Sequence, residues 1–262
     1  MTRRIKRLKD FEVTLEIKND QFIRPPRDSQ RNWLLNRAVK EFSDELTYLN
    51  EQAKDFVAGV DSTWSDRTQA ALTDEEIMEG WQIPIMRAMA QAVCVSHGAI
   101  LEIGFGRGVG SDFIQQEGVT SHTIIECNDS IVQRFETWRA AFADRDIRIV
   151  HGMWQDTIGD LGQFDGIFFH TYPLNESEFV DQVAHSSTFA EHFFDTAATH
   201  LKPGGCFSYL TNESDSLSRA HQRAILRRFS SFSLSVVKDL DIPEDTCDAM
   251  WGDSMIVVQV IK

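Results

Sequence analysis

Hydrophobic and polar residues follow two different periods in the first third of this chain. From Phe11 to Ile17 they alternate at every second position, which is typical of a strand with one buried face. Apolar residues then recur at helical spacing and predict one amphipathic helix over residues 29–57. Thr73–Glu76 has the sequence of a capping box and predicts the start of a short helix. A further helix is predicted from Ile85 to Val95.

From Ala99 onward, short apolar strands alternate with helical stretches. This alternation predicts a mostly parallel sheet covered by helices on both faces, and the last two strands, close in sequence, suggest an antiparallel edge. The predicted strands are 99–103, 123–126, 147–150, 164–169, 206–210, 234–240 and 254–261, and the predicted helices are 109–117, 129–143 and 178–200. We expect an N-terminal extension and cap over residues 1–95 and an α/β body over residues 96–262.

The composition is that of a folded protein and narrows the choice of partners. Of the 262 residues, 42% are hydrophobic and 25% are charged, which are ordinary values for a globular protein. The net charge is −14, and an acidic body argues against binding nucleic acid through its phosphates. No apolar run is long enough to cross a membrane and no secretory signal precedes the first strand. We therefore expect a soluble cytoplasmic protein that binds neither membranes nor nucleic acid.

The cysteines and histidines show no spacing that would indicate a metal site or a disulfide framework. The four cysteines are scattered and contain no C-x-x-C pair, so reduced thiols are expected. The histidines likewise lack ligand spacing, and we predict no metal.

The strongest chemical signal is a glycine-rich turn between a strand and a helix, at Leu101–Gly110. Glycines let the backbone approach a ligand closely, but such a turn could hold a dinucleotide or no ligand at all. Glu102 lies within the strand, where an acid suits a cationic ligand and is a poor neighbour for a pyrophosphate. Glu126 ends the next strand, where an acid accepts hydrogen bonds from ribose hydroxyls. Together these features favour S-adenosylmethionine over NAD.

Several segments between Met78 and Asn212 resemble the guanidinoacetate N-methyltransferase family. The resemblance rests on Met78–Met86, Leu101–Gly106, Ile124–Asp129, Gly152–Asp156, Phe164–Leu174 and Leu201–Gly205. It covers about half of the chain and does not extend to the first 75 residues. It implies the seven-stranded, Rossmann-like fold of class I methyltransferases.

The resemblance also implies roles for individual residues. S-adenosylmethionine would be bound, and S-adenosylhomocysteine released, by residues near its methionine end, ribose and adenine. The implied cofactor-binding residues are Trp81, Met86, Glu102, Gly104, Gly106, Glu126, Cys127, Met153, Trp154, Gln155 and His170. The implied catalytic residues, on the acceptor side, are His170, Gln82 and Tyr172.

Two departures from the family affect the acceptor. The family holds its guanidino substrate with two carboxylates, and at the matching positions this chain has Gln82 and His170. A guanidinium is permanently charged and pairs with carboxylates through paired hydrogen bonds, so a guanidinium acceptor is disfavoured. Histidine could instead act as a base, or as a cation that binds an acceptor carboxylate.

Two kinds of acceptor remain open: the oxygen of a carboxyl or hydroxyl group, and a neutral amine or imidazole nitrogen. We expect a small or peptide-borne acceptor, in natural-product biosynthesis. The alternatives are a guanidino or amino N-methyltransferase with altered anchors, an enzyme that cyclises S-adenosylmethionine itself, and a scaffold that only binds the cofactor. Arg107, next to the second loop glycine, is expected either to meet a substrate carboxylate or to be solvated.

The sequence also predicts a role for the segment before residue 75. Residues 1–40 hold 11 basic and 5 acidic residues, and the arm Arg3–Lys9 is expected to be a solvated terminus. The strand at 11–17 has no evident partner nearby in the sequence, so it could pair across a homodimer. We expect this segment to act as a lid, a dimer interface or a docking surface.

Overall fold

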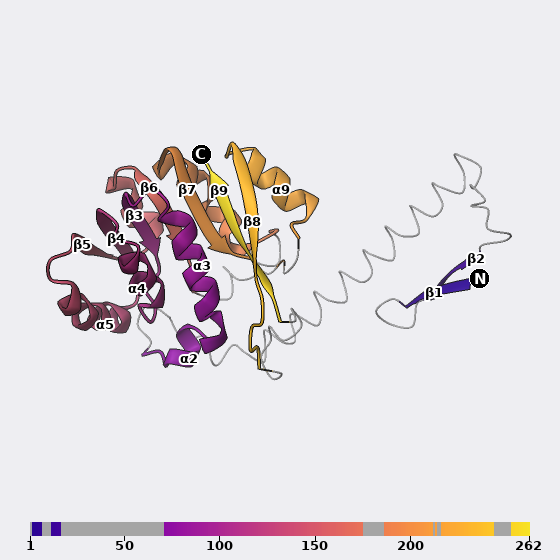
Figure 1. The fold of residues 1–262 in the computed structure, drawn as a ribbon, viewed down its shortest axis with the longest axis horizontal. Helices are drawn as coiled ribbons and strands as arrows, with labels where there is room; N and C mark the ends of the chain where they lie inside the picture. The colour runs from indigo at the N-terminus through magenta and orange to yellow at the C-terminus, as the bar shows by residue number, and fades with distance from the viewer. Residues whose placement is uncertain are drawn as a thin grey trace. The chain divides into compact units, whose positions relative to one another are not determined.

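The computed structural model describes residues 71–174, 186–211, 213, 216–243 and 253–262, together with the backbone of two strands near the N-terminus (Figure 1). The chain forms two compact units, Met1–Asp61 and Ser62–Lys262. Among the described residues, no helix is both long and apolar enough to span a lipid bilayer.

The first unit contains an antiparallel hairpin. β1 (Thr2–Lys6) pairs along its whole length with β2 (Glu12–Glu16). The strand expected at 11–17 is therefore present, but the expectation that it lacks a nearby partner was wrong. The basic arm supplies that partner as the antiparallel strand β1. Because β2 pairs with a strand of its own chain, the lack of a partner is no longer a reason to expect pairing across a dimer. The helix predicted over residues 29–57 lies outside the described residues.

The second unit is built on a mixed sheet that has seven strands in the described part of the chain. The strand order is β5-β4-β3-β6-β7-β9-β8, in which the first five strands are parallel and β9 runs antiparallel to both β7 and β8. The strands are β3 (Ala99–Ile103), β4 (Ser121–Glu126), β5 (Ile147–His151), β6 (Phe164–Phe169), β7 (Leu201–Leu210), β8 (Ser231–Val237) and β9 (Met255–Ile261). This order confirms the predicted α/β fold, including its antiparallel edge.

Two strands differ from their predicted bounds by three residues or more. β7 begins at Leu201, five residues before the predicted start, and its pairing with β6 is irregular near that end. The glycines at 204 and 205 resemble a turn in sequence, yet they lie within the strand. β8 begins at Ser231, where serines alternate with Phe232 and Leu234 in the period of a strand.

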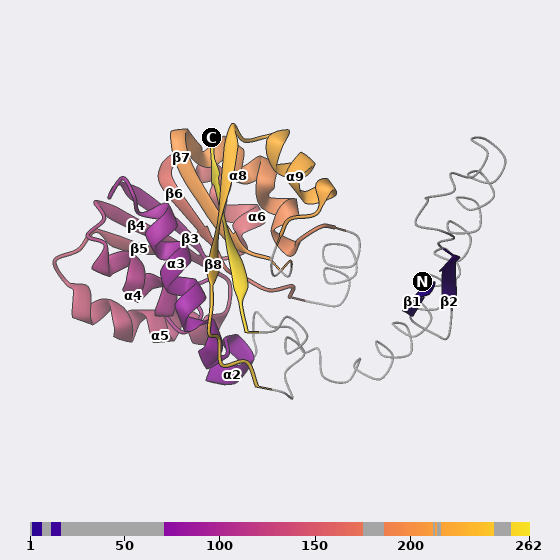
Figure 2. The same cartoon turned by 45° about the vertical axis from the view of Figure 1, so that its right-hand side comes forward.

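Helices cover both faces of the sheet (Figures 1 and 2). On one face lie α3, α4 and α5, and on the other lie α6, α8 and α9. The helices are α2 (Asp74–Ile77), η1 (Gly80–Gln82), α3 (Ile83–Val93), α4 (Val109–Gln116), α5 (Asp129–Arg139), η2 (Ala140–Phe142), α6 (Trp154–Thr157), η3 (Ile158–Asp160), η5 (Phe189–Phe193), α8 (Phe194–His200) and α9 (Arg219–Leu226). Among the described residues, the helix predicted over 178–200 is helical only from Phe189.

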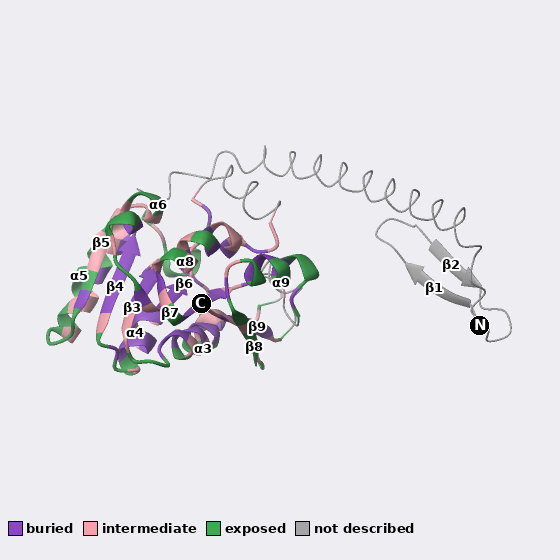
Figure 3. Cartoon of the chain, turned by 90° about the horizontal axis from the view of Figure 1, so that it is seen from above, coloured by how far each residue is buried: buried purple, intermediate pink, exposed green. Residues whose placement is uncertain are grey.

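The strands of the central sheet are buried between these layers (Figure 3). Successive residues of β3 face opposite sides: Ile100 packs with α3 and α4, whereas Leu101 packs with α8 and α9.

The predicted capping box is present, since the Thr73 side chain accepts the Glu76 N–H and the Glu76 carboxylate accepts the Thr73 N–H. Burial raises the pKa of the Cys94 and Cys206 thiols to about 12, so both are protonated at neutral pH.

A buried chain of three polar side chains fastens the loop after β7 to α9. The hydroxyl of Tyr209 lies 2.7 Å from Nε2 of His221, and Nδ1 of His221 lies 2.7 Å from the Glu213 carboxylate. A carboxylate can only accept, so Nδ1 carries the proton and Nε2 accepts from the tyrosine. Tyr209 and His221 are fully buried, so each depends on this chain for its hydrogen bonds.

Replacing Tyr209→Phe should destabilise the fold. The change leaves Nε2 of His221 buried without a donor, which costs about 1–3 kcal/mol. Urea unfolding at pH 7 measures the loss as a lower midpoint with an unchanged slope. Ser235→Ala, on the exposed strand β8, is the control and should shift stability by less than about 0.5 kcal/mol. Equal stability of the two variants would contradict the assigned network.

Candidate active site

The carboxyl ends of the parallel strands border an open cleft, in which the space between the walls, including what is open to solvent, is about 400 Å³. In an open α/β sheet this edge is where ligands bind. The cleft is formed by residues that end or follow β3, β4, β5 and β6, together with one residue of η5. Its lining residues are Ile103, Gly104, Ile125, Glu126, Cys127, Gly152, Met153, Trp154, Gln155, Thr171, Tyr172, Leu174 and Phe189. Seven residues predicted from the sequence are thereby brought together: Gly104, Glu126, Cys127, Met153, Trp154, Gln155 and Tyr172.

The glycine loop after β3 passes very close to the end of β6. Gly104 has a φ of 87°, and a Cβ added there would lie 2.5 Å from the carbonyl oxygen of His170. Only glycine fits this position, both for its conformation and for its contact. The backbone at Gly104 can therefore form part of the cleft wall itself.

Glu126 connects the loops that follow β3 and β4. One carboxylate oxygen accepts the N–H groups of Phe105, at 2.9 Å, and of Gly106, at 3.4 Å. The other oxygen accepts the N–H groups of Cys127 and Asn128, both at 2.9 Å. Four backbone donors thus hold one buried negative charge at the edge of the cleft. Gly106 contributes through this contact and does not line the cleft.

The residues that follow β5 form a further wall of the cleft, beside the glycine loop and Glu126. Met153 precedes the first turn of α6, and Trp154 and Gln155 lie within that turn. The Trp154 indole packs edge-on against Phe193, with ring centroids 4.9 Å apart. The tryptophan is therefore fixed by the core while part of it borders the cleft, as the predicted adenine-binding surface requires.

Glu102 lies beneath the glycine loop and not on the cleft lining. Its side chain is 1% exposed and accepts a hydrogen bond from the Ser111 hydroxyl on α4. Nε2 of His122 lies 3.0 Å from the same carboxylate, and Nδ1 of His122 lies 3.1 Å from the Gln115 amide. Glu102 thus helps to fasten α4 to β3 and β4, and its predicted contact with the cofactor stays a prediction.

His170 directly follows β6, next to the cleft residue Thr171. Its backbone N–H donates to the carbonyl of Ile103 at 3.2 Å, and the residue is partly buried. Burial lowers the pKa of His170 to about 4, so the imidazole is neutral at pH 7. Of the two roles expected for this histidine, a proton acceptor is favoured over a cationic anchor.

The three remaining predicted residues precede the sheet. Trp81 is buried in η1 and its indole N–H donates to the Glu79 carboxylate. Gln82 is partly exposed at the start of α3. Met86 is 1% exposed and packs in the core between α3 and the sheet. None of the three lines the cleft, and the packing of Met86 explains its burial without a ligand.

Sequence analysis missed six lining residues: Ile103, Ile125, Gly152, Thr171, Leu174 and Phe189. Ile103 and Ile125 are the last apolar residues of their strands, and that position alone could have identified them. Phe189 comes from a distant part of the chain, so no local signal marks it. Arg107 proved to be neither free nor directed at the cleft, since its guanidinium donates to the Met78 carbonyl at 3.0 Å.

The charge state of His170 can be tested by NMR titration of its imidazole. We expect a midpoint near pH 4, against an ordinary value of 6.5. Between these two values the unfolded chain binds a proton that the folded protein does not, so stability falls as pH drops from 6.5 to 4. His170→Asn should remove that part of the slope, whereas His97→Asn, on the exposed surface, should not. A midpoint above pH 6 would contradict the desolvated site.

Comparison with known proteins identifies the family. The model of the family "Guanidinoacetate N-methyltransferase" matches residues 50–240. Protein arginine N-methyltransferase 2 from Kluyveromyces lactis is 27% identical over 185 residues, which are 65% of this chain and 42% of that protein. The same-named protein from Eremothecium gossypii is 28% identical over 143 residues, 51% of this chain and 32% of the relative. The chain thus spans less than half the length of these relatives.

Solved structures show the same fold. The precorrin-6y C5,15-methyltransferase of Geobacter metallireducens superposes with a TM-score of 0.50 at 14% identity, over 73% of this chain and 98% of that one. The match over most of the sheet-bearing unit agrees with the strand order and with the cleft at the strand ends. The chain therefore belongs to the guanidinoacetate N-methyltransferase family, and its sheet-bearing unit has the fold of a solved methyltransferase.

Proposed function

We propose that this enzyme methylates a neutral, proton-bearing nitrogen or oxygen of a small or peptide-borne acceptor, and not a guanidinium. The observation that carries the proposal is the histidine at residue 170, where the resemblance implies a carboxylate, and burial lowers the pKa of this histidine. Gln82, at the other acceptor position, is also uncharged. A permanently charged guanidinium would find no anionic partner at either position.

The residues that line the cleft suit S-adenosylmethionine in their chemistry. Glu126 supplies the acid for the ribose, and a ribose hydroxyl would displace the longest of its four donors, the Gly106 N–H at 3.4 Å. Met153 and Trp154 supply an apolar surface for the adenine, and Gln155 a hydrogen bond to its edge. When bound, the cofactor supplies an electrophilic methyl group on a sulfonium.

On the acceptor side the chain's own residues orient the acceptor and remove its proton. An unprotonated imidazole nitrogen of His170 takes the proton that a hydroxyl, amine or imidazole must lose on methylation. The Gln82 amide can donate or accept, so it orients a neutral group without demanding a charge. Tyr172 lines the cleft and is 56% exposed, which places its hydroxyl where an incoming acceptor can reach it.

Guanidino methylation is the second candidate, and the relatives' names favour it. Both relatives cited above are called protein arginine N-methyltransferases, and the family is named for a guanidino acceptor. Against this stands the loss of two charge-assisted contacts, each worth about 1.5–3 kcal/mol. The two candidates differ in a measurable way, because only one requires a negative charge at residues 82 and 170.

The first test concerns the cofactor loop. Gly104→Ala should abolish detectable calorimetric binding of S-adenosylhomocysteine, because the new Cβ would collide with the His170 carbonyl. Gly118→Ala is the matched control: its φ of 68° is also left-handed, but no atom lies within 4 Å of the added Cβ. The control should lose about 1 kcal/mol of stability and keep its affinity. Tight binding by the Gly104 variant would show that the cleft is not the cofactor site.

The second test restores the family's charges. Guanidinoacetate should leave the affinity of the wild-type enzyme for S-adenosylhomocysteine unchanged. The double variant Gln82→Glu, His170→Asp should bind guanidinoacetate at least about tenfold more tightly, which corresponds to about 1.4 kcal/mol. Gln116→Glu adds a charge to an exposed position on α4 and should have no effect. Clear coupling in the wild-type enzyme, or methylation of arginine peptides, would favour the second candidate.

Product analysis in the same assays identifies the reaction. S-adenosylhomocysteine formed together with a methylated hydroxyl, amine, imidazole or carboxyl compound would identify the acceptor class. Methylthioadenosine formed without an acceptor would instead mean that the enzyme cyclises the aminobutyrate chain of its own cofactor.

A further inference from the structure

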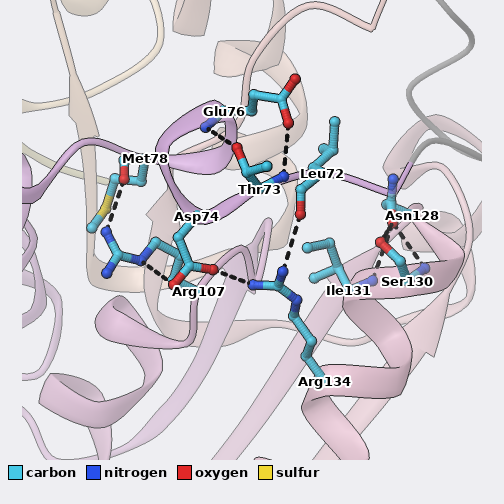
Figure 4. Close-up of polar contacts among 10 residues, drawn as sticks. All are labelled: Leu72, Thr73, Asp74, Glu76, Met78, Arg107, Asn128, Ser130, Ile131 and Arg134. Atoms are coloured by element: carbon cyan, nitrogen blue, oxygen red, sulfur yellow. Dashed lines mark hydrogen bonds and ion pairs between the residues drawn. The ribbon is translucent and has the colours of Figure 1, made fainter.

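The short helix α2 is held at both ends by arginines from other elements (Figure 4). At its N-terminal side, Arg134 of α5 donates to the carbonyl of Leu72 at 3.0 Å. At its C-terminal side, Arg107 of the glycine loop donates to the carbonyl of Met78 at 3.0 Å. A single helical turn has little stability of its own, so these contacts decide where it lies.

Asp74 lies between the two arginines and contacts both. One of its carboxylate oxygens is 2.5 Å from Nη1 of Arg134, and the other is 3.7 Å from Nε of Arg107. The Arg134 guanidinium lowers the pKa of Asp74, so the carboxylate is charged at neutral pH. Asp74, Arg107 and Arg134 therefore form one continuous ionic cluster across α2.

The two arginines belong to the elements that follow the two cofactor-side strands. Arg107 lies in the glycine loop after β3, and α5, which carries Arg134, begins two residues after Cys127 at the end of β4. Between them, Ile77 of α2 packs against the aromatic cluster of Phe105 and its neighbours. The Ile77 side chain is also the only contact within 4 Å of a Cβ added at Gly106. Helix α2 thus covers the glycine loop.

The same segment leads directly into the acceptor side. Gln82, at the start of α3, lies four positions after Met78, whose carbonyl is held by Arg107. By holding the Met78 carbonyl, Arg107 therefore also constrains the position of Gln82 on the acceptor side.

We infer that Asp74 is a positioning residue which, through Arg107 and Arg134, fastens residues 72–82 over the glycine loop and so sets the cofactor loop and Gln82 in place together. Three glycines of the loop, at 104, 106 and 108, adopt positive φ, and the cover by residues 72–82 adds to the support that the Glu126 carboxylate gives the loop. Fixing the loop before the cofactor arrives lowers the entropy lost on binding. The inference rests on S-adenosylmethionine as the cofactor but not on the identity of the acceptor.

The test is calorimetric binding of S-adenosylhomocysteine to Asp74→Asn. Partly exposed ion pairs are individually weak, so we expect the dissociation constant to rise about three- to tenfold at low salt. Because salt screens exposed charges, the difference from wild type should shrink at 0.5 M NaCl, an added concentration of about three times the physiological ~0.15 M. Glu75→Gln is the matched control: it is exposed on the same turn, makes no ion pair among the described residues, and should bind like wild type.

A second readout separates positioning from a general loss of stability. Hydrogen exchange should show that S-adenosylhomocysteine protects residues 72–82 in the wild-type enzyme and much less in Asp74→Asn, while protection of β3 and β6 is equal in both. Arg134→Gln should weaken binding to a similar degree, and combining it with Asp74→Asn should add little further loss.

Three results would overturn the inference. They are unchanged affinity in Asp74→Asn, an equal loss in Glu75→Gln, and a loss of protection spread over the whole sheet. Absence of S-adenosylhomocysteine binding by the wild-type enzyme would overturn it too, together with the cofactor assignment. Binding without methylation of any neutral acceptor would instead contradict only the proposed acceptor and leave the positioning role intact.

Discussion

The cleft depends on one close approach, between the backbone of Gly104 and the carbonyl of His170. Parallel strands β3 and β6 are neighbours in the sheet, so the loops that leave them must share a narrow space at its carboxyl edge. A glycine at 104 lets them do so, and the carboxylate of Glu126 then fixes the first loop from the other side through backbone amides. The cofactor surface and the acceptor-side histidine are consequently placed by the same contact.

The same arrangement determines the charge carried by the residues around the cleft. The buried charge on Glu126 is balanced by four backbone N–H dipoles and not by a cation, so it stays available to a ribose. On the acceptor side no such balance exists. Burial keeps His170 neutral, and Gln82 brings no charge. Under the proposed function, this contrast suits a cationic cofactor beside an uncharged acceptor.

Much of this could be predicted from the sequence, and the failures have identifiable causes. Alternating strands and helices predicted the sheet, and the glycine turn with Glu126 and Met153–Gln155 predicted three walls of the cleft, because strand ends meet at one edge in this fold. Met86, assigned to the cofactor from a motif, packs in the core between α3 and the sheet and does not line the cleft, so its contact with the cofactor stays a prediction. Phe189 reaches the cleft through tertiary packing alone, and the partner of β2 was missed because a run of basic residues looked like a solvated terminus.

Family membership and local chemistry favour different acceptors, and the proposed function follows the local chemistry. A family shows that a scaffold and a cofactor are shared, whereas the acceptor is chosen by the few groups that touch it. A guanidinium keeps its charge at any physiological pH, so it cannot adapt to a neutral site by losing a proton first. Amines, imidazoles and hydroxyls can present a lone pair without a full positive charge, and each has a proton that a neutral histidine can accept. Under the proposed function, residues 82 and 170 select a neutral acceptor, whereas the glycine loop and Glu126 serve the methyl donor.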